Sequence, residues 1–522
     1  MGKPHNKSPR PAERRKSELS VWAEFGELIN SCNRESLVRL VAAIYFWNGE
    51  APAFARPHLV IQLIAKYHRA ESSEPARMSV ALQTVRLARL VEFANLLKLS
   101  QQVAEKRGVR ADAEWETHTL RHWSSIITNP GTVGEMLSYL LDKFRPFDST
   151  LHERLGFTST EACRTILTIY FGLDDAFHSY VDRKTAFIRR RFGPEKHSKS
   201  LLTPPADFLR TWASVSRFPP DLWAHGRAPL LNRRVIDFLT TDIANLSPRG
   251  LSFGRWAFMR EADGASSLLV PEMLTETLVS AIHFALFQDI DEERAGNLGR
   301  KLGRQFEELV AAKIRQNWPS VTVRERVIVD GVEGDTDLVV DVPGGKSLLI
   351  QCKGKPLRPV GRWGGILTFE DDLRRTIGEA GKQASASVRA FGGAERVGSV
   401  LIVVDAYFPG LLQTARGGLK DLSLWDQLPG LLVLTHYDLS YLTRRLSPED
   451  LPRYLSWREE LLTDGQTKVF DEYDLIRAYL KWRRTGFLGD SPGRAPDQYI
   501  GYDREFEKET LQQVGERLAK GD

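Results

Sequence analysis

Three polar residues between positions 334 and 355 have the types and spacing for metal-dependent phosphate chemistry. This stretch reads GDTDLVVDVPGGKSLLIQCKGK and contains Asp337, Gln351 and Lys353. Successive side chains of a strand point to opposite faces, so Gln351 and Lys353 share one face and Cys352 lies on the other. Burying a Gln and a Lys without partners costs about 1–3 kcal/mol or more each. A divalent cation and a phosphate would supply partners, because carboxylate and amide oxygens suit Mg²⁺ and a lysine suits a phosphate.

The pattern around these residues predicts an α/β core. Apolar periodicity predicts helices over 299–316 and 370–391, and strands over 321–330, 336–342, 347–354, 399–408 and 430–439. Glycine and proline between the first three strands are typical of hairpin turns. The continuous apolar run at 399–408 favours a strand that is buried on both faces. The expected element order is therefore α-β-β-β-α-β.

This arrangement resembles the PD-(D/E)xK restriction-endonuclease-like superfamily, whose motif is an acidic residue, a short hairpin and then (D/E/Q)-x-K on the following strand. The QCK variant, with TDLVV before it and a preceding G-x-x-F-E helix, is most similar to Mrr-type restriction endonucleases. The resemblance covers about 297–408. It implies a restriction-endonuclease-like core and a Mg²⁺- or Mn²⁺-dependent endonuclease that hydrolyses phosphodiester bonds. The resemblance alone favours DNA over RNA, and a restriction or defence effector is a further inference by analogy.

The helix over 299–316 adds a fourth candidate residue. Glu307 borders the apolar face of this helix, whereas Glu308 groups with its polar side. The resemblance also puts a glutamate in the F-E position that Glu307 occupies. We therefore expect Glu307, Asp337 and Gln351 to hold the metal ion. With Lys353, which would orient the attacking water or stabilise developing charge, they form the expected catalytic set.

Each of these residues also has a simpler interpretation. Glu307 could form an ion pair on the helix surface, Asp337 could be a turn residue after Gly334, and Lys353 could extend to water from a strand end. Cys352 is expected to be a small buried hydrophobe. The neutral amide of Gln351 holds a cation more weakly than a carboxylate. The alternative function is therefore a catalytically degenerate nuclease-fold protein that acts as a nucleic-acid-binding or scaffold module.

Two flanking features are compatible with a nucleic-acid partner. The loop 355–370 contains Lys355, Arg358 and Arg362 next to glycines and an aromatic residue, so it could contact a phosphate backbone or be an ordinary surface loop. Gln383, in the second helix, resembles a glutamine that several members of the superfamily carry near the active site. It could equally be an ordinary polar residue of a helix.

The length of the chain predicts several domains. A chain of 522 residues is too long for one hydrophobic core. The patterns suggest a basic disordered tail (1–18), a largely α-helical domain (19–200), a mixed linker domain (201–296), the nuclease-like domain (297–440) and a helical C-terminal extension (441–522). The net charge of +5 is concentrated in residues 1–16, so bulk charge does not identify a partner.

Composition also limits the setting. The three cysteines are far apart, which argues against a disulfide scaffold and a structural zinc site. No apolar stretch is long enough for a membrane helix, and the basic start runs into polar sequence instead of a signal peptide. We expect a cytoplasmic protein with no membrane partner, and the sequence leaves open whether it forms a homo-oligomer.

Overall fold

The computed structural model describes fourteen parts of the chain. These are residues 11–48, 57–69, 72–107, 133–192, 203–224, 230–242, 257–269, 271, 274–327, 336–354, 371–405, 424–463, 472–485 and 504–520. They form two compact units, the first comprising 1–119 and 165–274 and the second 120–164 and 275–522. The expected segments 19–200 and 201–296 each contribute to both units, whereas 297–440 and 441–522 lie in the second unit. One boundary between the units falls inside helix α8 (Ser159–Phe192).

The first unit is mostly helical. Its helices are α1 (Pro11–Ile29), α2 (Arg34–Asn48), α3 (Pro57–Tyr67), α4 (Met78–Arg107), most of α8, α9 (Ala206–Val215), α10 (Asp221–Ala224) and α11 (Arg233–Phe238). A small sheet has the order β1-β4-β3-β2, from strands Arg217–Phe218, Ser266–Leu268, Phe258–Arg260 and Thr240–Thr241. Aromatic side chains from α2, α8 and α9 pack together, with the Phe46 and Trp212 ring centroids 4.7 Å apart. Such edge and tilted contacts add to the apolar area that is buried.

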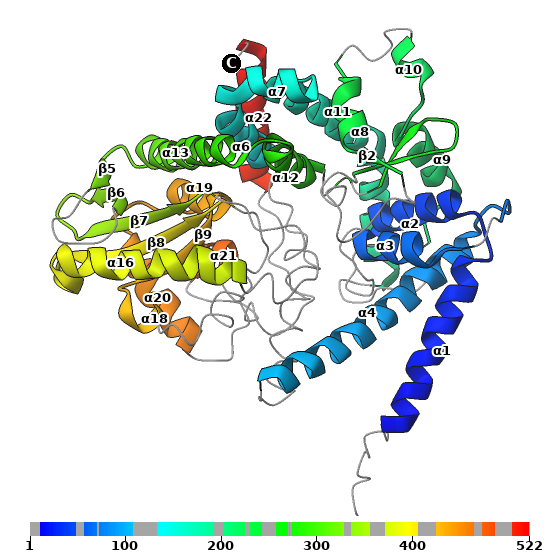
Figure 1. Ribbon diagram of the computed structural model, residues 1–522, viewed down its shortest axis with the longest axis horizontal. Coiled ribbons are helices and arrows are strands. Elements are labelled where there is room, and N and C mark those ends of the chain that lie inside the picture. The colour runs from blue at the N-terminus through cyan, green and yellow to red at the C-terminus, as the bar shows by residue number, and fades with distance from the viewer. Residues whose placement is uncertain are drawn as a thin grey trace, which may run out of the picture. The chain divides into compact units, whose positions relative to one another are not determined.

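A five-stranded sheet organises the second unit (Figure 1). Its order is β5-β6-β7-β8-β9, from strands Thr322–Val327, Thr336–Asp341, Ser347–Lys353, Val397–Val404 and Leu432–Thr435. β5, β6 and β7 are antiparallel, and β8 and β9 continue in parallel with β7. The turn between β6 and β7 places Gly344 at φ +67°, a conformation that glycine adopts without strain. This sheet positions the residues singled out in the sequence.

Helices cover both faces of the sheet. Helix α13 (Glu292–Asn317) buries Phe306, Val310 and Ile314 against Leu338, Ile350 and their neighbours on one face. On the other face, α16 (Glu379–Ala390) buries Ala380, Ala384 and Val388 against Val339, Leu349 and Ile402. A π-helical turn, η6 (Arg374–Gly378), precedes α16. Because β7 and β8 are apolar on both sides, they fit between the two helical layers.

Helices from distant parts of the sequence complete the α13 layer. They are α6 (Val133–Phe144), α12 (Leu274–Phe287), α19 (His436–Arg445), α20 (Leu451–Thr463), α21 (Glu472–Thr485) and α22 (Arg504–Lys520). Tyr139 of α6 and Phe506 of α22 belong to the same buried cluster as Phe306. At Gly134, a Cβ atom would overlap the backbone of Thr510 and Leu511, so glycine permits a close crossing of α6 and α22. The remaining short elements of this unit are η1 (Arg145–Phe147), α7 (Asp148–Leu155), η7 (Gly393–Glu395) and α18 (Leu424–Gln427).

The expectation of an α/β fold is confirmed, and the helices and strands from α13 to β8 follow the predicted order α-β-β-β-α-β. Three elements differ from their predictions. The helix expected over 299–316 begins earlier, at Glu292, because Asp291 caps its N-terminus, so the expected domain start at 297 falls inside this helix. The strand expected over 430–439 ends at Thr435, because Thr435 and Asp438 form a reciprocal capping box that starts α19. The segment expected as a disordered tail over 1–18 is helical from Pro11, a residue type that the first turn of a helix tolerates.

No helix in the described parts of the chain is long and apolar enough to cross a membrane.

Candidate functional site

The end of the β6–β7 hairpin brings together two of the predicted residues. Leu338 of β6 pairs with Ile350 of β7 in an antiparallel register. The residue before Leu338, Asp337, therefore lies opposite the residue after Ile350, Gln351, on the face of the sheet that α16 covers. The ladder stops there, and the Asp337 carboxylate accepts a hydrogen bond of 2.7 Å from the backbone N–H of Cys352. This bond fixes the carboxylate at the strand end. Gln351 is buried, with 1% of its surface exposed.

Lys353 is the last residue of β7 and shares the face of Gln351. Its Nζ donates a hydrogen bond of 2.8 Å to Oε1 of Gln383 on α16. The backbone carbonyl of Lys353 accepts a hydrogen bond of 2.8 Å from the N–H of Asp405, just beyond β8. Both ends of this lysine are therefore held, and Gln383 belongs to its surroundings. Cys352 points to the opposite face and is buried there, as predicted.

Glu307 approaches the same strand end from α13. The helix passes directly against the chain after Lys353, since a Cβ at Gly354 would lie 3.0 Å from Cα of Gly303. Partial burial and the nearby negative charge of Asp337 raise the pKa of Glu307, and Arg326 opposes this shift. The side chain of Glu307 is 25% exposed, against 47% for Glu308. Glu307 is thus the carboxylate of this pair that lies nearer the sheet.

Arg326 is a charged neighbour that the sequence reasoning missed. Its guanidinium lies 3.5 Å from Oε2 of Glu307, and its φ of +51° interrupts the ladder between β5 and β6. A positive φ at a residue other than glycine costs about 1–3 kcal/mol and is often found at functional sites. The alternation of charges in TVRERV gives no sign of this conformation. The Glu307 partner of Arg326 lies on another element, so spacing along the chain could not indicate it.

A buried polar cluster supports the neighbouring strand end. Asp405 follows β8, and its carboxylate binds both Lys143 and Tyr139 of α6. All three side chains are buried, and burial raises the pKa of Tyr139 and lowers that of Lys143. The sequence analysis did not single out Asp405, although a charged residue directly after the apolar run SVLIVV could have indicated it. For the partners on α6, the signal was the spacing of four positions between Tyr139 and Lys143 on an apolar helix face, and it was not used.

The oxygen donors at the strand end are compatible with a magnesium site. Mg²⁺ is commonly held by one or two carboxylates together with waters and substrate phosphates. Burial, and after it the negative charge of Asp337, raise the pKa of Glu307, and a cation would relieve the repulsion between the two carboxylates. Throughout the described parts of the chain, no group of three or more His, Cys, Asp or Glu side chains is placed to hold a metal ion. Gln351, opposite Asp337 at the strand end, offers an amide oxygen beside the two carboxylates.

Comparisons with known proteins give no assignment. The chain matches no protein-family model, no curated protein and no solved structure. The site therefore rests on its own geometry.

Three of the predicted nucleic-acid-binding residues, Lys355, Arg358 and Arg362, lie outside the described residues, as does the loop 355–370 as a whole. The fourth, Gln383, contacts Lys353. The binding role of the loop stays a prediction.

Proposed function

We propose that the second unit is a metal-dependent nuclease of the PD-(D/E)xK type that hydrolyses phosphodiester bonds, with DNA as the preferred substrate. The observation that carries the proposal is the meeting of three charged residues from different elements at one strand end. Asp337 of β6 accepts a hydrogen bond from the N–H of Cys352, and Lys353 is the next residue of β7. Helix α13, which carries Glu307, passes directly against Gly354, the residue after Lys353. Acidic and basic groups so arranged are suited to bind a cation and a phosphate together.

The roles of the residues follow from their chemistry. Asp337 and Glu307 would hold Mg²⁺ or Mn²⁺ with the amide oxygen of Gln351. A bound divalent ion supplies Lewis acidity and lowers the pKa of a bound water. Lys353, oriented by Gln383, would place its ammonium beside the scissile phosphate and stabilise the charge that develops there. Arg326 offers a second positive charge beside Glu307.

A second candidate is a nuclease-fold protein that binds nucleic acid without cleaving it. The specific observation in its favour is the donor set, since only two carboxylates and one neutral amide meet in the described site. A neutral donor weakens metal affinity. Binding with no turnover under any divalent ion would support this alternative.

Metal dependence is the direct test of the proposal. Purified full-length protein is incubated with plasmid DNA and with RNA, in Mg²⁺, Mn²⁺ or EDTA. We expect cleavage of DNA with Mg²⁺ or Mn²⁺ and none with EDTA, because the reaction needs the bound ion to activate water. Asp337→Asn, which keeps the side-chain volume but removes the charge, is expected to be inactive. Equal cleavage by wild type and Asp337→Asn would assign the activity to a contaminant or another site.

Gln383→Ala tests how Lys353 is positioned. Removing the amide acceptor leaves the Lys353 ammonium free to adopt other rotamers, and we expect the single-turnover cleavage rate to fall by about tenfold. The melting temperature should change little, because Gln383 lies at the partly exposed border of α16. Lys382→Ala, an exposed neighbour on the same helix, is the matched control. A Gln383→Ala enzyme as fast as the control would exclude a positioning role.

A further inference from the structure

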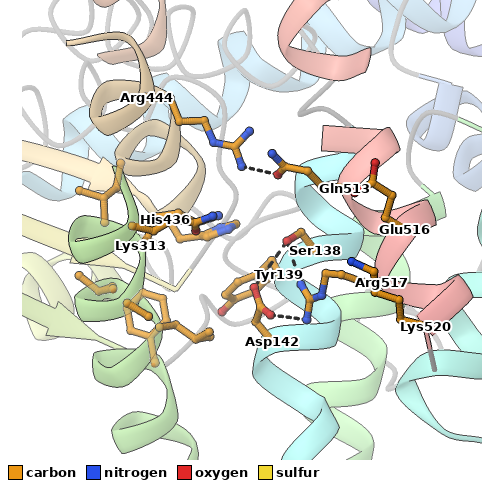
Figure 2. Close-up of a pocket in the computed structure, with 16 residues that line it drawn as sticks. Ser138, Tyr139, Asp142, Lys313, His436, Arg444, Gln513, Glu516, Arg517 and Lys520 are labelled. Atoms are coloured by element: carbon orange, nitrogen blue, oxygen red, sulfur yellow. Dashed lines mark hydrogen bonds and ion pairs between the residues drawn. The ribbon is translucent and has the colours of Figure 1, made fainter. Parts of the chain in front are cut away.

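A cavity in the second unit lies apart from the residues assigned to cleavage. It has a volume of about 460 Å³ and lies among α6, α13, α19 and α22 (Figure 2). Cavities of about 300–1,000 Å³ are the usual size for small-molecule sites. Neither Asp337 nor Lys353 lines it, although Phe306, the residue before Glu307, does. The cavity is therefore a separate candidate site for a small molecule.

One part of the wall is apolar and flat. Tyr139 and His436 stack with ring centroids 3.9 Å apart and an interplanar angle of 29°. Tyr139, Phe306, Val310 and Leu439 are buried, at 4% exposure or less, so a ligand would reach the imidazole of His436, whose side chain is 13% exposed, together with Leu309 and Ala312. Aromatic and aliphatic surfaces of this kind favour a planar, apolar group of a ligand.

The rest of the wall is cationic. Four cationic side chains line it, from α13 (Lys313), α19 (Arg444) and α22 (Arg517 and Lys520), against two carboxylates, Asp142 and Glu516. Figure 2 shows Arg517 directed at Asp142, and the two groups are 2.6 Å apart. One cationic charge therefore remains in excess even when the buried Glu135 is counted with the carboxylates.

Glu135 explains how the cations are held together. Its carboxylate is fully buried, 3.2 Å from Lys313, 3.8 Å from Arg444 and 3.6 Å from the imidazole of His436. A buried carboxylate is tolerated only with such partners. It draws Lys313 and Arg444 to the cavity wall, where both stay partly exposed, at 14% and 11%. These side chains are thereby pre-organised to donate hydrogen bonds to an incoming anion.

We propose that this cavity binds a small organic phosphate of mononucleotide size. The cationic side chains would bind the phosphate, and the imidazole of His436 with Leu309 and Ala312 would receive a planar group. An anion without a planar group would use only the cationic wall, and a planar neutral molecule would use only the apolar wall. Affinity should therefore require both parts of the ligand.

Isothermal titration of the full-length protein with adenosine monophosphate, adenosine and inorganic phosphate tests this proposal. We expect adenosine monophosphate to bind at least about tenfold more tightly than either of its parts, and its affinity to fall as salt is added. Adenosine binding as tightly as its phosphate would overturn the proposal. No detectable binding of the nucleotide at millimolar concentration would overturn it as well.

Two variants locate the binding. Lys520→Glu reverses an exposed charge at the cavity, and we expect it to weaken nucleotide binding by roughly threefold to tenfold. Lys508→Glu makes the same change at an exposed position of α22 that does not line the cavity, and should leave binding unchanged. Ala312→Trp fills the cavity from an exposed helix position without altering its charges, and should abolish binding. Wild-type affinity in both Lys520→Glu and Ala312→Trp would place the ligand elsewhere.

Discussion

Lys353→Ala is expected to lower the rate of DNA cleavage by about 10²- to 10⁴-fold, because stabilisation of developing charge acts mainly in the transition state. Folding and DNA affinity should change little. The Lys353 side chain is partly exposed, so the substitution removes its hydrogen bond to Gln383 without opening a cavity in the core. Single-turnover cleavage, thermal unfolding and DNA binding in the presence of Ca²⁺ measure the three quantities separately.

Asp337→Ala separates the metal site from the phosphate site. It should be as inactive as Lys353→Ala but, unlike that variant, should lose the calorimetric signal of metal binding. Lys346→Ala, at the turn of the same hairpin, is the matched control; it loses only an exposed hydrogen bond to the carbonyl of Ala394. If Lys353→Ala cuts as fast as this control, the proposed mechanism is wrong even though the hairpin is intact.

Lys143→Met is expected to destabilise the second unit by about 3–5 kcal/mol, since it leaves the Asp405 carboxylate buried without its cationic partner. Urea unfolding followed by far-ultraviolet circular dichroism should show an earlier transition. Arg304→Met is the comparison, because the Arg304–Glu308 pair is exposed and should contribute under about 1 kcal/mol.

A double-mutant cycle shows whether the loss comes from the pair. In Lys143→Met with Asp405→Asn, no uncompensated charge is buried, so the double variant should be more stable than the sum of the two single effects predicts. Strict additivity would mean that Lys143 and Asp405 stabilise the protein independently. The contact between them in the fold would then be energetically unimportant.

The core could be predicted from the sequence because its signals are local. Period-two alternation in 347–353 places Cys352 opposite to Gln351, and the helical period of 299–316 distinguishes Glu307 from Glu308; the structure agrees with both. The Thr435–Asp438 capping box was also local. It was missed because the apolar run before it obscured the start of the helix.

The rest depends on contacts between distant residues. Lys143 and Asp405 are separated by 262 positions. Glu135 and Lys313 lie on different helices, α6 and α13, and no sequence spacing indicates that they form an ion pair. Each of these residues looks like an ordinary helix or strand-end charge until the fold buries it. The left-handed conformation of Arg326 likewise has no signature in residue type, because arginine has no preference for it. Tertiary packing determines these features.

The close crossing of α6 and α22 affects how the protein folds during its synthesis. The two helices meet at Gly134 and Thr510, yet α22 is made roughly 360 residues after α6 ends. At a synthesis rate of about 5–20 residues per second, the apolar face of α6 lacks its partner α22 for some tens of seconds. The five-stranded sheet emerges during that interval with the α13 side only partly covered. The second unit must therefore complete its folding after α22 has left the exit tunnel, and a nascent chain arrested before residue 504 should be bound by chaperones and degraded by proteases.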